Sequence, residues 1–163
     1  ERFELSYKDE NGEENGEVFV IHRAPLSTHE RFVAFLTEHW SGCFPTWLSP
    51  IQIQVITISE KQKKYASKVA SILKEEGIRV SVDDSDATIG KKIRMHRKMR
   101  PAYMLILGED EEKEQTVSIR IDRKGGSRSA DQCNGIPLEK FVKDLSVEVN
   151  SKNKELTLVP KED

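Results

Sequence analysis

Residues 51–77 read IQIQVITISEKQKKYASKVASILKEEG, and this stretch decides the fold. The first eight residues predict a β-strand over 51–58, with apolar side chains on both of its sides. The residues that follow predict an amphipathic helix over 60–77, which ends at Gly77, a residue typical of helix C-termini. The apolar face of this helix consists of Tyr65, Val69, Ile72 and Leu73. A strand followed at once by such a helix is typical of α/β domains.

The alternation of strands and helices continues downstream of this unit. Strands are predicted over 78–84, 102–108 and 116–122, and helices over 88–100 and 136–149. The predicted fold class is therefore α/β, with a mostly parallel, mixed sheet of about five strands and three helices packed on it. The acidic segment 109–115 is expected to be a solvated loop, and the polar residues after Asn150 are expected to fray.

The residues upstream of this domain are organised differently. We predict a strand over 2–8, a polar turn, a returning strand over 18–24 and an amphipathic helix over 27–40. A capping box of Ser27 and Glu30 would begin this helix. The prolines and glycine of SGCFPTWLSP break it, which places a domain boundary near 42–50. The predicted segments are 1–45, 46–150 and a polar C-terminal tail, 151–163. Because the sequence begins inside a strand-like pattern, we expect the natural N-terminus to lie upstream.

Bulk composition excludes some classes of protein. The chain has 163 residues, of which 33% are charged, and its formal net charge is −2. This balance excludes a globally basic nucleic-acid binder and leaves room for a local basic patch. The two cysteines, Cys43 and Cys133, form neither a CxxC motif nor a disulfide framework, which suits a reducing compartment. No apolar run approaches the ~18 residues that would span a bilayer, so we expect no membrane partner.

The predicted helix over 88–100 is strongly basic. It carries six Lys or Arg residues and no acid, and Lys91, Arg94 and Lys98 share one of its faces. A solvated helix face is the ordinary interpretation, and a surface that binds phosphate is the functional one. Arg120 lies on the polar side of its predicted strand, where it could either extend toward solvent or hold a base edge or phosphate. A carboxylate of the acidic segment could accept hydrogen bonds from unstacked bases.

The junction IHRAPLSTHERF, residues 21–32, combines two histidines and two arginines. Zinc needs four ligands, and the four His and two Cys of the chain show no ligand spacing. The residues alone therefore give no complete metal site, and they show no Gly-rich phosphate loop or nucleophile elbow. They indicate an α/β domain with a plausible RNA-binding face, joined to a fragment with a cationic junction.

As a whole, the chain resembles the C-terminal part of the threonyl-tRNA synthetases, which are class II aminoacyl-tRNA synthetases. The resemblance rests on the order and spacing of several segments. These are IHRAPLSTHERF, CFPTWLSPIQIQVITI, GIRV, the IGKKIR stretch, YMLILGEDE and TVSIR. It implies that residues 1–45 are the end of a catalytic domain, including the third class II motif, and that residues 46–150 are an anticodon-binding domain.

The resemblance also implies roles for individual residues. His22 matches a zinc ligand, Arg31 an ATP-binding arginine, and Thr28 a position near the adenylate. Arg94, Glu111 and Arg120 match positions that read the anticodon, and Lys91 and Lys98 would meet tRNA phosphates. The chain departs from the family pattern at Pro25 and Ser27, where an aliphatic residue and a glycine are usual. A third departure is Asp86, which replaces an asparagine that helps to read the anticodon.

The function implied is that of a threonine–tRNA ligase, which activates threonine with ATP and Mg and transfers it to tRNA(Thr). The complete enzyme would carry zinc and form a homodimer. Residues 1–163 by themselves would mainly recognise the anticodon, would hold no zinc and would be inactive alone. The alternative is a non-catalytic synthetase-like accessory or RNA-binding protein. We expect a mitochondrial matrix location, with the cytoplasm as the alternative.

Overall fold

The computed structural model describes residues 4–122 and 131–158. The chain divides into two compact units, Glu1–Phe35 and Leu36–Asp163. The domain boundaries expected near residues 45 and 150 stay predictions.

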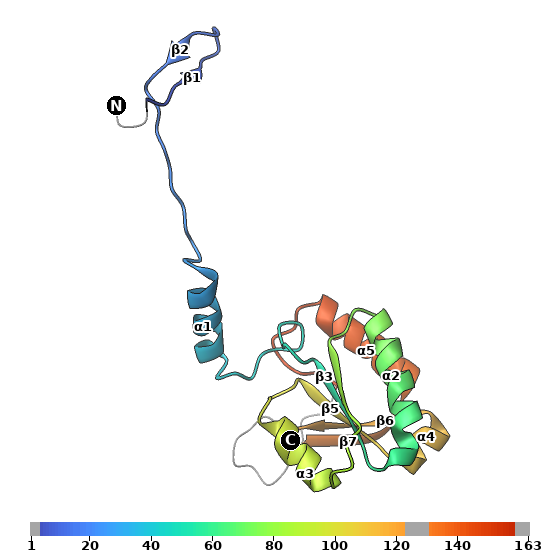
Figure 1. The fold of residues 1–163 in the computed structure, drawn as a ribbon. Helices are drawn as coiled ribbons and strands as arrows, with labels where there is room; N and C mark the ends of the chain where they lie inside the picture. Colours follow the sequence, from blue (N-terminus) through green and yellow to red (C-terminus); the bar gives the residue numbers. More distant parts are fainter. Residues whose placement is uncertain (1–3, 123–130, 159–163) are drawn as a thin grey trace. The chain divides into compact units, whose positions relative to one another are not determined.

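The second unit is built on a five-stranded mixed sheet within its described residues (Figure 1). The strands are β3 (Ile53–Thr57), β4 (Val80–Asp83), β5 (Tyr103–Leu107), β6 (Thr116–Ile121) and β7 (Asp131–Pro137), in the spatial order β4-β3-β5-β6-β7. β3 runs parallel to β4 and to β5, while β5 with β6 and β6 with β7 pair antiparallel. The predicted α/β class and mixed sheet are confirmed.

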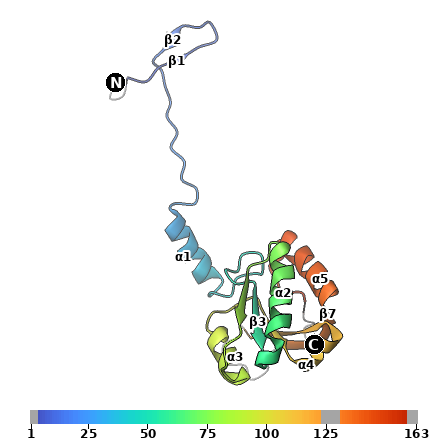
Figure 2. The same cartoon turned by 45° about the vertical axis from the view of Figure 1, so that its right-hand side comes forward.

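Helices cover both faces of this sheet. They are α2 (Lys63–Glu75), preceded by a 3₁₀ turn at Glu60–Gln62, α3 (Ile89–Arg97), α4 (Glu109–Glu114) and α5 (Leu138–Asn150). The crossover through α2 leads from β3 out to the edge strand β4, and the crossover through α3 leads back to β5. Crossovers between parallel strands are right-handed as a rule, so two that run in opposite directions place their helices on opposite faces, as Figure 2 shows for α2 and α3.

The apolar core lies between the sheet and the pair α2 and α5. β3 and β5 contribute Ile53, Val55, Tyr103 and Leu105, all fully buried. Leu73 of α2 and Phe141 and Leu145 of α5 close over them. The apolar residues whose helical and strand spacing identified these elements in the sequence therefore lie on the faces that pack into one core.

Two elements differ from the prediction. Residues 109–114, expected to be a loop, form α4, because the Glu111 carboxylate accepts the Gly108 N–H and acidic side chains favour a helix N-terminus. A β-carbon at Gly108 would lie 2.8 Å from Ile58 Cδ1 and 2.9 Å from Glu111 Oε2, so these side chains would have to move to admit one. Strand β7 was not predicted, since DQCNGIP has no apolar alternation. It forms by pairing with β6 at the sheet edge, where a terminal proline is tolerated.

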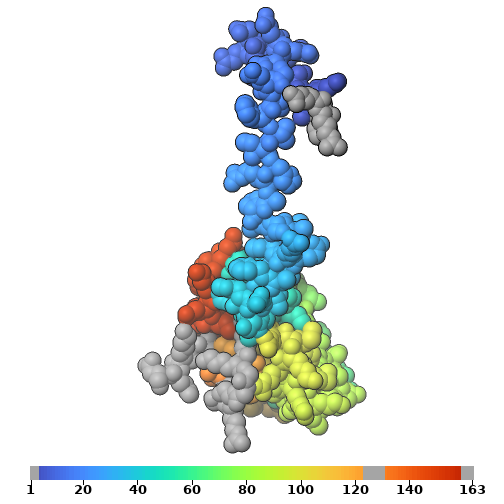
Figure 3. All heavy atoms as spheres, turned by 90° about the vertical axis from the view of Figure 1, so that its left-hand side faces the viewer, coloured from blue at the N-terminus to red at the C-terminus, as the bar shows by residue number. Residues whose placement is uncertain are grey.

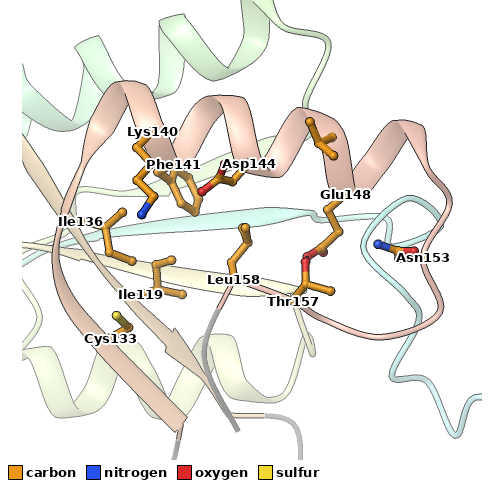
Figure 4. A pocket seen from close by; sticks show the side chains of 11 residues that line it. Ile119, Cys133, Ile136, Lys140, Phe141, Asp144, Glu148, Asn153, Thr157 and Leu158 are labelled. Atoms are coloured by element: carbon orange, nitrogen blue, oxygen red, sulfur yellow. Dashed lines mark hydrogen bonds between the residues drawn. The ribbon is translucent and has the colours of Figure 1, made fainter.

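The polar tail does not fray over its described part, residues 151–158. Glu148 is 2% exposed, and its carboxylate accepts hydrogen bonds from the hydroxyls of Thr46 and Tyr103 and from Thr157. Figure 4 shows Glu148 and Thr157 facing one another beside Leu158. A buried carboxylate needs such donors, so it holds the tail against α5. Residues 159–163 lie outside the described part.

The first unit has little regular structure. Strands β1 (Tyr7–Lys8) and β2 (Glu14–Asn15) pair antiparallel, and β2 lies inside the predicted turn. The returning strand predicted over 18–24 is wrong for the described chain, in which Phe19, Val20 and Ile21 are 93%, 73% and 81% exposed. A short apolar run such as residues 18–21 forms a strand only where a neighbouring strand pairs with it and an apolar layer covers it.

Helix α1 (His29–His39) begins two residues later than expected. The predicted capping box of Ser27 and Glu30 is wrong. The Thr28 hydroxyl instead accepts the Arg31 N–H at 3.5 Å, and the Thr28 carbonyl accepts the Phe32 N–H. Ser27 has a φ of +58°, a left-handed conformation that lies outside the helix.

Candidate nucleic-acid interface

Helix α3 presents a row of cations to solvent. Lys91, Arg94 and Lys98 are all exposed, as their spacing predicted. In Figure 3, α3 forms an open bulge on the surface of the second unit. Six positive side chains on and after one short helix create a local field that the net charge of the chain conceals. This field suits a polyanion.

Arg120 of β6 is turned toward the same side of the sheet as α3. Its Nη2 donates to Asp122 Oδ2 at 3.4 Å, and Arg97 of α3 donates to Asp122 Oδ1 at 3.0 Å. Asp122 thus joins α3 to the end of β6. The Nε–H of Arg120 is buried and has no hydrogen-bond partner within residues 4–122 and 131–158. A buried donor without a partner is costly, so this position favours an incoming acceptor.

Glu111 lies beside Arg120 on the same face. Its Oε1 accepts the Ser118 hydroxyl at 2.6 Å, and its Oε2 accepts the Gly108 N–H at 2.9 Å. Ser118 precedes Arg120 by two strand positions, so the two side chains point the same way about 7 Å apart. Each carboxylate oxygen has a further lone pair, so Glu111 is fixed in place and can still accept a hydrogen bond.

Asp86 lies at the margin of this face. It is exposed in the turn between β4 and α3, and its carboxylate is 3.6 Å from Lys63 Nζ. Lys63 also donates to Glu60 at 3.0 Å, and this hydrogen bond is the main reason that its pKa is raised. The weak ion pair with α2 leaves the Asp86 carboxylate open to solvent.

Polar contacts that sequence reasoning missed lie beneath α3. Lys92, counted in the sequence as one of the cations, points inward and donates to the Thr57 carbonyl at 2.9 Å. His96 lies 2.6 Å from Asp83 of β4. Burial by itself raises the pKa of Asp83, but the hydrogen bonds from Ser85 and His96 outweigh burial and lower it. The available signal was an acid at the end of two of the predicted strands, Asp83 at the end of β4 and Asp122 directly after β6.

The structure therefore brings Arg94, Glu111 and Arg120 to one face of the sheet, with Lys91 and Lys98 on the same helix as Arg94 and Asp86 at the margin. Two cavities of the second unit lie away from this face. One of about 500 Å³ lies below α5 and beside the tail (Figure 4). Another of about 770 Å³ lies between α2 and α5. The described part of the candidate interface is a charged surface whose residues Lys91, Arg94 and Lys98 are exposed, as binding of an extended nucleic acid requires.

The first unit does not bring its candidate residues into one site. His22 is exposed and in no strand, and Thr28 and Arg31 are exposed at the start of α1. Thr28 lines a hollow of about 260 Å³, and Arg31 does not. No group of three or more His, Cys, Asp or Glu side chains that could hold a metal occurs in the described part of the chain. None of its described helices is long and apolar enough to cross a bilayer.

Comparison with known families and relatives agrees with this picture. A family described as an anticodon binding domain matches residues 52–148. The threonine–tRNA ligase of Petrotoga mobilis is 41% identical over 157 residues, which are 96% of this chain and 23% of that protein. The ligase of Clostridium tetani is 43% identical over 152 residues, which are 93% of this chain and 23% of that protein. The chain spans less than a quarter of the length of these relatives.

Solved structures show the same similarity. The RNA binding domain of threonyl-tRNA synthetase from Cryptosporidium parvum Iowa II superposes with a TM-score of 0.67 and 37% identity, over 78% of this chain and 30% of that one. A putative threonyl-tRNA synthetase from Aeropyrum pernix gives a TM-score of 0.59 at 24% identity, over 82% of this chain and 32% of that one. The second likeness shows the fold alone.

Proposed function

Since this chain belongs to the anticodon-binding domain family, as the C-terminal region of a threonyl-tRNA synthetase, we propose that the face between α3 and β6 reads the anticodon of tRNA(Thr). The observation that carries this proposal is Arg120, whose buried Nε–H lacks a partner among the described residues. An arginine fork can donate to base edges or phosphate, and the neighbouring Glu111 can accept from exposed base amino groups. The cations of α3 supply the attraction to the backbone.

The test separates base contacts from phosphate contacts. Arg94→Ala, Glu111→Ala and Arg120→Ala should each weaken binding of tRNA(Thr) by ~1–3 kcal/mol and have little effect on a tRNA with a swapped anticodon. Lys91→Ala and Lys98→Ala should weaken both tRNAs alike and reduce the salt slope by roughly one unit each. Lys74→Ala, on the opposite side of the sheet, is the control. Equal losses on both tRNAs for the first three variants would refute base reading.

For the intact protein we propose the activity for which its relatives are named, the ligation of threonine to tRNA. Arg31 would counter phosphate charge on ATP bound with Mg, and Thr28 would lie near the adenylate. The His22 imidazole does not make a complete zinc site, because the described residues hold no group of three or more His, Cys, Asp or Glu side chains that could bind a metal. We expect the remaining ligands and the homodimer contacts in the rest of the enzyme.

This second proposal has its own test in the full-length enzyme. His22→Ala should abolish threonine-dependent pyrophosphate exchange and lower the zinc content, while tRNA binding stays nearly intact. Arg31→Ala should also lose exchange but keep its zinc, because it acts on ATP. Normal exchange rates in either variant would exclude the corresponding role. The mitochondrial matrix remains our proposed location, and localisation of the tagged full-length protein by microscopy would distinguish it from the cytoplasm.

A further inference from the structure

Helix α3 is held to the sheet by polar side chains. Of the residues of α3, all of which the structure describes, Lys92 alone is buried, with 1% of its surface exposed. Its Nζ donates to the Thr57 carbonyl at 2.9 Å and to the Thr57 hydroxyl at 3.2 Å. Both acceptors belong to the last residue of β3. The helix that carries the candidate RNA-binding cations is therefore attached to the central strand through an ammonium group.

Burying the Lys92 ammonium group costs free energy. A buried ammonium group loses its hydration, and no ion pair of Lys92 occurs within residues 4–122 and 131–158. An apolar residue of similar volume would fill the same space without that loss of hydration. Stability alone therefore does not explain the lysine. Hydrogen bonds differ from apolar contacts in being directional, so Lys92 fixes where α3 lies along β3.

Two further contacts complete the attachment. His96, one turn after Lys92, lies 2.6 Å from Asp83 Oδ2 at the end of β4, and Ser85 holds the other oxygen of Asp83. Arg97 reaches Asp122, directly after β6, at 3.0 Å. The anchors thus reach β3, β4 and the end of β6, which are three different places. Three separate points fix both the position and the rotation of a short helix.

We propose that Lys92 and His96 are positioning residues for RNA binding, which set the register and rotation of α3 so that Arg94 faces a base. This inference rests on the proposed anticodon-reading function. Lys92 and His96 themselves touch no RNA, since one is buried and the other is occupied by Asp83. Their role is to keep the exposed row Lys91, Arg94 and Lys98 at a fixed distance from Arg120.

The decisive variant is Lys92→Met in the full chain, compared with Lys91→Met, which removes the same charge from the exposed face. Lys92→Met should leave the free energy of unfolding unchanged or raised. It should also lower the ratio of affinities for tRNA(Thr) and an anticodon-swapped tRNA by roughly tenfold, with the salt slope unchanged. Lys91→Met should weaken both tRNAs and leave the ratio unchanged. A ratio unaffected by Lys92→Met in a folded protein would overturn the proposal.

Two additional measurements test the anchoring of α3 independently of Lys92→Met binding data. Thr57→Val removes one acceptor and keeps the lysine, so it should give a smaller loss of the ratio if Lys92→Met fails to fold. Hydrogen exchange without RNA should show faster exchange of the α3 amides in Lys92→Met and unchanged exchange in α2. Unchanged α3 exchange would refute the positioning role. If Arg94→Ala leaves the tRNA ratio intact while α3 exchange rises in Lys92→Met, anticodon reading fails and the anchoring survives.

Discussion

Helices α2 and α3 follow neighbouring strands and lie on opposite faces of one sheet, yet α2 is attached by apolar contacts and α3 by hydrogen bonds and ion pairs. α2 buries Tyr65, Ala66, Val69, Ala70 and Leu73, whereas α3 buries Lys92. Apolar burial contributes roughly 25 cal/mol per Å² and has no preferred direction. A hydrogen bond contributes only about 1 kcal/mol net but is directional. The α2 face therefore supplies most of the stability, while the α3 face supplies a defined arrangement of charge.

The largest effect should come from a cavity under α2. Leu73→Ala removes a fully buried side chain and should cost ~2–5 kcal/mol of unfolding free energy in urea titrations. Ile93→Ala, in the partly buried part of α3, should cost less than half as much. Similar losses at the two positions would contradict the division between the faces. Neither variant removes a proposed RNA contact.

A second effect concerns the buried hydroxyl of α2. Tyr65 donates to the Thr116 carbonyl at 2.7 Å, and burial, followed by the nearby acids Glu111 and Glu112, raises its pKa to about 12. The neutral phenol is thus favoured in the folded state. Its contribution is complete below the ordinary pKa of about 10 and is lost as pH rises toward 12, by about 2 kcal/mol. Tyr65→Phe should remove this part of the alkaline decline in unfolding free energy.

The attachment of α3 should instead respond to acid. The folded pKa of Asp83 is lowered, since its hydrogen bonds with Ser85 and His96 outweigh the effect of burial. Its stabilising contribution, about 1 kcal/mol, is present above the ordinary Asp pKa of about 3.9 and is lost as pH falls through the lower folded value. Amide exchange of α3 should therefore accelerate in this range before that of α2. Asp83→Asn should remove this difference in acid sensitivity between α3 and α2. If exchange accelerated in both helices at the same pH in the unaltered protein, Asp83 would not be the cause.

The smallest effect on stability belongs to Asp86. Its contact with Lys63 is long, at 3.6 Å, and its side chain is 79% exposed, so Asp86→Asn should change the unfolding free energy by less than about 1 kcal/mol. The same change should shift the preference among tRNA anticodons if position 86 reads a base. Binding titrations with several anticodon variants would detect the shift. An unchanged preference would leave Asp86 as a surface residue.

Sequence periodicity predicted the elements whose faces are buried, because β3, α2 and α5 owe their structure to local apolar patterns. It also pointed to Arg94, because the stretch 88–100 is basic and holds no acid, and to Arg120, which lies on the polar side of its strand. That either residue contacts RNA stays a prediction. It could not separate Lys92 from the cations around it, because direction depends on where a helix meets the sheet. Strand β7 and the ordered tail depend on partners distant in the chain, namely β6 and Glu148.

The Glu148 network has a consequence for synthesis of the protein. Its carboxylate accepts hydrogen bonds from Thr46, 102 residues earlier, and from Thr157, nine residues later. A ribosome makes the first donor long before the acceptor and the last donor after it. The buried acid therefore stays incompletely bonded until residue 157 has left the ribosome. Until then the sheet and its helices can form, while the Glu148 carboxylate still lacks the Thr157 donors that close the tail over α5.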